Sequence, residues 1–422
     1  MRVCFRFCFV AVLANVLFAA SAWAGGLWLY EQATPDMGVA AAGRQAAAMD
    51  ASTASGNPAG MTRLERSQLE SGIMGIYPVL KFEIQEASEG GGDGGNAGYF
   101  TPGATFYYVH SLSPDLKLGL GTGSYFGLGL DYSTKWAGRY YVQSGEFLTA
   151  GVNPSVGYRV NRWLSIGGGF SIVYGELTNR TAINNLLPAQ GDGRLKYDAT
   201  DVGYGFNGGA LFELSPRTRF GVTYNSEVKL DFKDELRFKN LGPGLKALLD
   251  ARGLLKTNLK VNWNIPQQVA IGAYHAITDK LAVLASANWQ DWSEFGTPEI
   301  SLSDGPDVSA NLDYDDTWHI GLGVQYRVAD PWLLMAGWGY DSSPISSDSD
   351  RSPSMPLDRQ FRYAGGVQYD WNENVSVGAA YTLIDAGKNR IKKTGNPVRG
   401  DLEGKYDPNF IHVFNLNFIY RF

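Results

Sequence analysis

The chain ends in HVFNLNFIYRF (residues 412–422), where hydrophobic and polar side chains alternate. Successive side chains of a β-strand point to opposite faces of the sheet, so this alternation predicts a strand with one apolar and one polar face. The apolar face runs to the last residue of the chain. Its members are Phe414, Leu416, Phe418, Tyr420 and Phe422, and the other face carries Asn415, Asn417 and Arg421 together with Ile419.

The same alternation recurs upstream, in HIGLGVQYRV (residues 319–328), VSVGAAYTL (375–383) and YGFNGGALFEL (204–214). The polar faces carry mainly Gly, Ser, Asn and Gln, whereas a soluble sandwich would turn charged side chains to water. The apolar faces end in Tyr, Trp or Phe, as in the aromatic girdles of membrane barrels. We therefore predict an all-β protein, a transmembrane antiparallel β-barrel of the bacterial outer membrane.

Short and long connections alternate between these strands, which is the outer-membrane pattern of tight periplasmic turns and long extracellular loops. This alternation predicts about 14 strands, an even number as in other bacterial single-chain barrels. The short turns lie near Ser113, Asn161, Ser215, Thr278, Ala329 and Trp371. The long loops are Glu86–Gly98, Gly129–Ala150, Gly175–Asp201, Lys233–Lys256, Ser293–Ala310, Asp341–Pro356 and Ala386–Gly404.

Residues 1–24 have the features of a secretory signal peptide, with Arg2 and Arg6 before an apolar run and an A-x-A site at its end. Both cysteines of the chain, Cys4 and Cys8, lie in this segment, so the mature chain offers no thiol chemistry. The net charge of -6 gives no basic footprint for nucleic acid. We expect export to the outer membrane of a Gram-negative bacterium, without a metal or a cofactor.

Residues 25–66 are rich in Ala and Gly and too irregular for a strand, and residues 67–422 form the predicted barrel. A barrel of this size encloses more space than its wall side chains fill, so the front segment is predicted to be a hatch that plugs the lumen. Pro58 is expected to end any helix and to hold Asn57 in an extended or turn conformation. The alternative is a disordered leader, but the apolar run Leu27–Tyr30 is atypical of disorder.

Four stretches, taken in order, resemble the outer-membrane long-chain fatty acid transporter family, which includes importers of toluene and other aromatic hydrocarbons. They are NPAGM (57–61), NWQDWSEF (288–295), YDSSPISSDSDRSPSMPLDRQFRYAGGVQY (340–369) and FIYRF (418–422). The resemblance implies a monomeric 14-stranded barrel among outer-membrane lipid and lipopolysaccharide. It also implies capture of a hydrophobic ligand in the outer loops, a pocket against the hatch and release through a kink in the third strand. Asn57, Pro58 and Ala59 match the family's hatch motif.

The third predicted strand, KLGLGTGSYFGLGLDYSTKW (residues 117–136), is interrupted by glycines that weaken strand pairing and permit a bend. One interpretation is a lateral gate at Gly123, Gly127 and Gly129. The other is that these glycines make room for the hatch, and the sequence leaves both open.

Two predicted outer loops carry apolar clusters, which on an exposed loop indicate a binding site or a partner. Leu245, Leu248 and Leu249 have helical i, i+3, i+4 spacing. The earlier loop contributes Ile183, Leu186 and Leu187. We predict that the two loops form the first capture groove, and simple packing of one loop on the other remains an alternative.

A fatty acid needs a cation for its carboxylate, and Arg is well suited to this contact. The resemblance places Arg180 within about a residue of a family arginine that contacts the ligand head group. A second basic residue of the fatty acid importers is absent, because NLDYDDTWHIG (residues 311–321) offers Asp313, Asp315 and Asp316 instead. Import of uncharged aromatic hydrocarbons therefore remains the alternative to import of long-chain fatty acids.

An outer-membrane lipid hydrolase is a third and weaker interpretation. The histidines, His110, His275, His319 and His412, are scattered, and no G-x-S-x-G motif precedes a predicted helix. A Ser/His pair on neighbouring strands remains possible from the sequence. We predict a passive importer and no enzyme.

Overall fold

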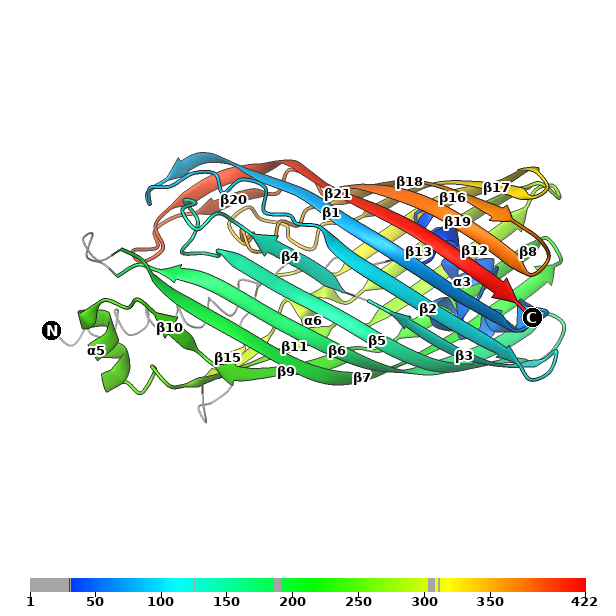
Figure 1. The fold of residues 1–422 in the computed structure, drawn as a ribbon, viewed down its shortest axis with the longest axis horizontal. Helices are drawn as coiled ribbons and strands as arrows, with labels where there is room; N and C mark the ends of the chain where they lie inside the picture. Colours follow the sequence, from blue (N-terminus) through cyan, green and yellow to red (C-terminus); the bar gives the residue numbers. More distant parts are fainter. Residues whose placement is uncertain (1–29, 31, 125, 186–190, 303–307, 310–311) are drawn as a thin grey trace.

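The structure is a computed structural model that describes residues 30 and 32–422, apart from 125, 186–190, 303–307 and 310–311. The predicted signal peptide, residues 1–24, lies outside the described residues. No helix in the described part of the chain is long and apolar enough to span a membrane. Most of the chain forms long tilted strands that close into a barrel (Figure 1).

The wall contains 14 antiparallel strands within the described residues, as the sequence predicted. They are β1 (Gln68–Ala87), β2 (Thr101–Ser111), β3 (Leu116–Gly123) continued by β4 (Gly127–Asp131), β5 (Ser144–Arg159), β6 (Leu164–Ile183), β7 (Gly193–Ser215), β8 (Thr218–Asn225), β12 (Gln268–Ala276), β13 (Leu281–Gln290), β16 (Thr317–Ala329), β17 (Trp332–Asp341), β18 (Gln360–Asp370), β19 (Val375–Asp385) and β21 (Leu402–Arg421).

Each strand pairs with the next along the chain, and β1 pairs with β21 to close the wall. This seam runs from the pair Gln68 and Arg421 to the pair Ala87 and Leu402. The six predicted tight turns are all present as short connections at one end of the barrel. Short turns of outer-membrane barrels face the periplasm, so the opposite end with the long loops faces outward.

The outer end carries additional elements. A four-stranded sheet continues the wall beyond β8, β12, β13 and β16. Its strands are β9 (Val228–Glu235), β11 (Asn258–Ile265), β14 (Glu299–Leu302) and β15 (Val308–Ser309), and the other outer elements are β10 (Arg237–Lys239), β20 (Arg390–Lys393), α5 (Pro243–Ala251) and α6 (Trp292–Phe295).

The two faces of the strands have the predicted polarity. On β21, Phe414 and Leu416 are more than half exposed on the outward face, whereas Asn415 and Asn417 are buried on the inward face. An outward apolar surface with a polar interior matches a wall that contacts lipid.

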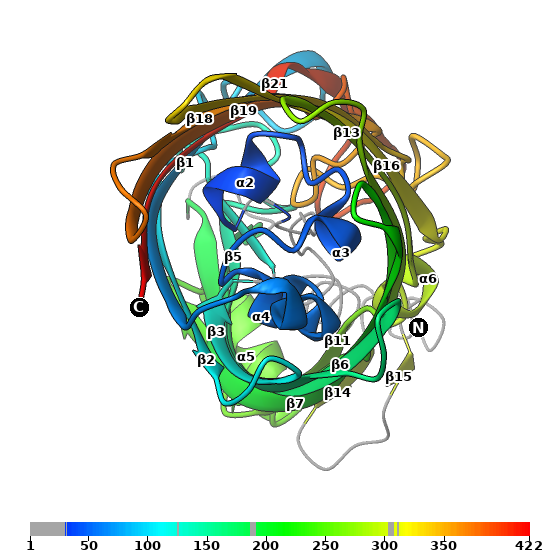
Figure 2. The same cartoon turned by 90° about the vertical axis from the view of Figure 1, so that its right-hand side faces the viewer.

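The described part of the predicted hatch, Tyr30 and residues 32–66, lies inside the barrel at the periplasmic end (Figure 2). It contains α2 (Thr34–Met37), α3 (Arg44–Ala47), α4 (Thr53–Gly56) and the 3-10 helix η1 (Pro58–Arg63). Asn57 is extended, with φ -157° and ψ 98°, as its position before proline predicted. Pro58 does not simply end helical structure, because it also starts η1, where its missing N–H has no consequence.

Candidate functional site, a passage through the barrel wall

The wall is interrupted between its second and third strands. β2 pairs with β3 only from the pair Phe106 and Thr122 downward to Ser111 and Lys117. Beyond that point β4 pairs with β5, and within the described residues no strand pairing joins it to β2. Its outer end is held by one hydrogen bond from the N–H of Asp131 to the carbonyl of Ala97, in the segment before β2, at 2.8 Å. The outer half of β2 and the strand β4 therefore leave a gap in the hydrogen-bonded wall.

A cavity of about 700 Å³ lies at this gap and is here called the wall cavity. Its inner part is lined by buried lumen residues, among them Met74, Ile384 and Val413. Its outer part is lined by residues on the lipid-facing side of the wall, including Val152 and Ile172, which are 42% exposed. The wall cavity therefore connects the lumen with the lipid face.

A buried charged group lies at the inner end of the wall cavity. Arg362, which lines the cavity, donates from Nε to Oδ2 of Asp341 at 2.8 Å. The other carboxylate oxygen of Asp341 lies 2.9 Å from Nδ1 of His319. The ring of Tyr30, from the hatch, contacts the His319 ring at 4.3 Å between centroids with the planes tilted by 32°, and it lies 5.0 Å from the Arg362 guanidinium. The hatch, the wall and the wall cavity thus meet at Arg362.

The hatch segment forms the floor of the lumen and fits closely against the wall. Asn57 donates from Nδ2 to the carbonyl oxygens of Gln45, in the hatch, and Ala210, in β7. Its Oδ1 accepts from the backbone N–H of Ala59. A Cβ atom added to Gly209 would overlap Oδ1 of Asn57, so only glycine allows the wall to approach this motif so closely.

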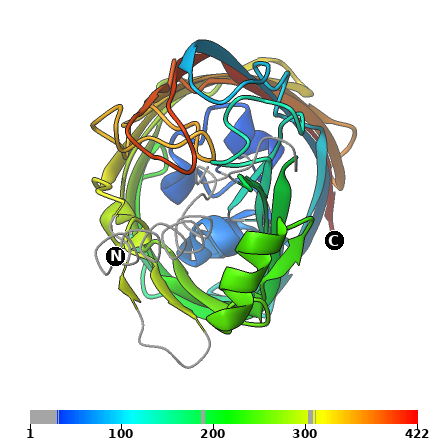
Figure 3. The same cartoon turned by 90° about the vertical axis from the view of Figure 1, so that its left-hand side faces the viewer.

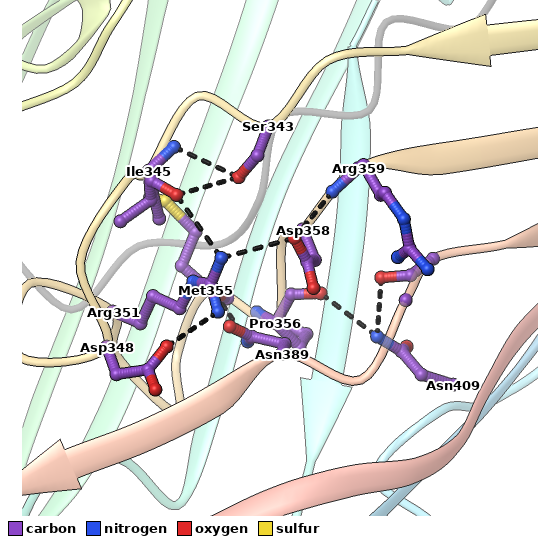
Figure 4. Close-up of polar contacts among 12 residues, drawn as sticks. Ser343, Ile345, Asp348, Arg351, Met355, Pro356, Asp358, Arg359, Asn389 and Asn409 are labelled. Carbon is purple, nitrogen blue, oxygen red and sulfur yellow. Dashed lines mark hydrogen bonds and ion pairs between the residues drawn. The ribbon is translucent and has the colours of Figure 1, made fainter.

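The loops at the outer end reach inward over part of the lumen and are here called the roof (Figure 3). The loop between β17 and β18 is held by Arg351, which bonds Asp348 at 2.9 Å and Asp358 at 3.1 Å, as Figure 4 shows. In the same loop Met355 is buried and accepts a hydrogen bond from Asn389. These contacts hold the loop in a compact fold and join it to the segment after β19.

Neighbouring loops complete this roof. Tyr132 donates to the carbonyl oxygen of Pro353 at 2.7 Å, which joins the loop after β4 to the loop after β17. Arg399 lies 5.6 Å from the ring of Tyr141. Burial raises the pKa of Tyr141 to about 12 and lowers the pKa of Arg399 to about 10. Both groups therefore keep one charge state near neutral pH.

Comparison with known proteins agrees with this architecture. Residues 15–422 match the family model described as outer membrane protein transport protein (OMPP1/FadL/TodX). The chain belongs to this family. It is 29% identical over 442 residues to the long-chain fatty acid transport protein of Escherichia coli O6:H1, with 97% of each chain covered.

Solved structures show the same fold. A Pseudomonas aeruginosa FadL homologue superposes with a TM-score of 0.87 at 22% identity, covering 94% of this chain and all of that one. The toluene transporter TbuX of Ralstonia pickettii gives a TM-score of 0.68 at 20% identity, with the same coverage. As a member of this family, the protein is an outer-membrane transport protein.

The three glycines predicted as a lateral gate all line the wall cavity, although their neighbours differ. A Cβ atom on Gly123 would approach Gln32 of the hatch to 2.9 Å, and one on Gly129 would overlap the hydroxyl of Tyr99. The contact of Gly123 fits the interpretation that glycine makes room for the hatch. Gly129 is instead close to a residue of the wall side, which leaves the gate interpretation open at that position. Their role in gating stays a prediction.

The predicted capture loops are joined through Asn185, which accepts from the N–H of Gly242 at 2.9 Å and donates to the carbonyl of Asn240. Leu249 is buried, whereas Leu245 and Leu248 are half-buried on α5. Ile183 packs against the main apolar core. Leu186 and Leu187 lie outside the described residues. The capture groove itself stays a prediction.

Arg180 is exposed on the outward face of β6, opposite Ser144 of β5 and Lys196 of β7. It is not among the residues that line the described part of the wall cavity, and its role as a head-group contact stays a prediction. The structure instead places Arg362 at the cavity. Sequence reasoning did not find Arg362, Asp341 and His319 as a group, because they come from three strands and only cross-strand pairing brings them together.

Proposed function

We propose that the protein imports hydrophobic small molecules passively across the outer membrane, with long-chain fatty acids as the first expected ligands. The ligand would be captured in the outer loops, pass to a pocket against the hatch and leave sideways. The observation that supports this most strongly is the wall cavity, which leads from the lumen to the lipid face beside an interrupted strand.

An apolar passage suits such a ligand better than a water-filled pore. Moving apolar surface into water costs about 25 cal/mol per Å². A ligand that stays among side chains such as Ile384, Val413 and Ile172 avoids this cost on its way to the membrane. Transport then requires binding sites in sequence and a gate, without an energy source.

The size of the wall cavity favours a chain-like ligand. A cavity of about 150 Å³ already holds benzene in another protein, and the volume of about 700 Å³ found here is several times larger. The long-chain fatty acid transport protein of Escherichia coli O6:H1 supports the same ligand class. Two observations keep aromatic hydrocarbons as the alternative: the fold is similar to that of the toluene transporter TbuX, and the stretch 311–321 contains Asp313, Asp315 and Asp316 but neither Lys nor Arg.

The hydrolase interpretation has one observation in its favour. His319 bonds Asp341, and Ser286 and His319 Nε2 both lie beside Gly321, which resembles the residue types of a catalytic triad. A nucleophile must contact its base, however, and the hydroxyl of Ser286 donates to the carbonyl of Ala41 instead. In the described part of the chain Nε2 of His319 has no hydrogen-bond partner. We therefore propose transport without catalysis.

We also propose that the protein acts as a monomer surrounded by outer-membrane lipid and lipopolysaccharide. The pairing of the first and last strands supports this, because β1 and β21 cover each other's edges and neither offers its edge to a partner strand.

Uptake into outer-membrane vesicles tests the proposed function. Vesicles carrying the full mature chain should take up labelled palmitic acid faster than vesicles without it, and a neutral sugar should enter both at the same rate. Uptake of toluene without palmitic acid would favour the alternative ligand class. Sugar entry that depends on the protein would instead indicate an open pore and would overturn the proposal.

A further inference from the structure

The outer end of the wall cavity is acidic. Glu176 lines the cavity and lies on the same face of β6 as Ile172 and Tyr174, which are 42% and 44% exposed to lipid. Val173 and Leu177, on the other face, are buried. Glu176 thus lies on the lipid-facing side of β6, directly beyond the outer end of its apolar band. Among the described residues it has no ion-pair partner.

A second carboxylate lies in the next row of the wall. Cross-strand pairing places Glu176 in one row with Leu148 and Gly127. In the next row outward, Glu146 lies between Gly129 and Thr178. Burial, followed by the charge of Glu146, raises the pKa of Tyr99, so this hydroxyl stays protonated against Gly129. We call Glu146 and Glu176 the acidic rim.

A third row, farther from the cavity, contains Asp131, Ser144, Arg180 and Lys196 in register. Its cations do not neutralise the acidic rim at close range. Lys196 pairs with Asp198 at 2.5 Å, and Arg180 lies two outward-facing positions beyond Glu176.

The inner end of the cavity does not supply a surplus positive charge either. Among the described residues that line the wall cavity, only Glu176 and Arg362 are charged. Arg362 is already bonded to Asp341, which also contacts His319. The lining as a whole therefore attracts a carboxylate weakly, and its exit repels one.

An amphipathic molecule that leaves through the wall moves its tail into lipid first, and its head follows at the membrane edge where Glu176 lies. Two carboxylates that share one site disfavour the charged form of at least one of them, and low polarity adds to this effect. A carboxylic acid head group at the acidic rim would therefore keep its proton.

We propose that the wall cavity releases its ligand in the uncharged form, so that a fatty acid leaves as the protonated acid with its O–H donating to the carboxylate of Glu176. The proton comes from the outer medium and stays with the acid. The inference rests on the proposed function and adds a preference of the exit for neutral molecules. An alcohol, an ester or a hydrocarbon passes the same rim without protonation.

Uptake of palmitic acid and of cetyl alcohol, which share a chain length and differ in the head group, tests this preference. Full-length mature protein in outer-membrane vesicles is assayed at about pH 5.5 and about pH 8, on either side of the range where a desolvated carboxyl group titrates. Uptake by vesicles without the protein is subtracted at each pH. The measured quantity is the ratio of acid uptake to alcohol uptake.

With the unmodified chain we expect this ratio to fall at least about fivefold between the two pH values. With Glu176→Gln it should fall less than about twofold, because the exit no longer repels the carboxylate. Glu146→Gln should act in the same direction. Glu403→Gln, which removes an outward carboxylate of β21 that does not line the cavity, should behave like the unmodified chain.

Two results would overturn the inference while leaving the import function intact. One is a ratio that stays constant with pH in the unmodified chain, and the other is an equal fall in the unmodified chain and in Glu176→Gln. If neither probe enters faster than in vesicles without the protein, the proposed function fails, and the exit preference fails with it.

Discussion

Asn57 donates from its side-chain amide to the carbonyl oxygen of Ala210 at 3.2 Å and thereby ties the hatch segment to strand β7. The same side chain bonds the backbone of Gln45 and Ala59, so one buried residue joins two parts of the hatch to the wall. The hatch motif is thus a structural connection between plug and barrel.

Replacing Asn57 by alanine should loosen this connection. The change removes the hydrogen bonds to the carbonyls of Gln45 and Ala210 and the acceptor of the Ala59 N–H, and a buried polar group left unpaired costs about 1–3 kcal/mol. We expect frequent ion-conducting openings in planar bilayers, where the unmodified chain stays closed. Asn161→Ala, in an exposed periplasmic turn, is the control. Equal, rare openings in both variants would show that Asn57 does not hold the hatch.

Two neighbouring glycines of β7 should respond very differently to an added methyl group. A Cβ atom on Gly209 would overlap Asn57, whereas one on Gly208 meets its nearest neighbour at 3.8 Å. Gly209→Ala should therefore lower the free energy of unfolding by about 1–3 kcal/mol, and Gly208→Ala should change it little. Urea denaturation followed by gel mobility compares the two. Similar midpoints would mean that the hatch shifts easily.

Filling the wall cavity should block uptake without unfolding the barrel. Ala150 lines the outer part of the cavity and is exposed, so tryptophan fits there without disturbing the core. We expect Ala150→Trp to reduce palmitic acid uptake at least about tenfold, since a filled passage excludes the ligand. Ala379→Trp, on the outward face of β19, is the matched control. Full uptake by Ala150→Trp would argue for exit through the hatch.

The capture groove can be tested on the two leucines of α5 that are not fully buried. Replacing Leu245 and Leu248 by aspartate should raise the ligand concentration for half-maximal uptake about five- to tenfold, because apolar contact area is lost. The maximal rate should stay the same. Leu249 is buried, so its replacement would also disturb the packing of the helix. Ala247→Asp, on the exposed face, is the control. An unchanged half-maximal concentration would exclude this groove.

The barrel could be predicted from the sequence because it depends on short-range patterns. Alternation in HVFNLNFIYRF gives a strand with an apolar outward face, and the alternation of short and long connections gives the number of strands. The position of the hatch followed from the broken, Ala-rich stretch before the first strand. These features need no knowledge of which residues face each other.

The passage depends on register, which a single sequence does not reveal. The gap arises because β2 stops pairing with the third strand at Phe106, and glycines alone do not indicate where pairing ends. Glu146 and Glu176 become neighbours of the cavity only through their cross-strand partners. The resemblance points to Arg180, but this residue lies on the outward face of β6 and outside the described cavity lining.

The seam between β1 and β21 also determines when the plug is enclosed. The hatch segment leads directly into β1, and β1 finds its second neighbour only in the last strand of the chain. Contacts between such distant parts of a chain form late in folding. For a hatch that packs before this seam forms, sealing the lumen and completing the wall are a single event in biogenesis.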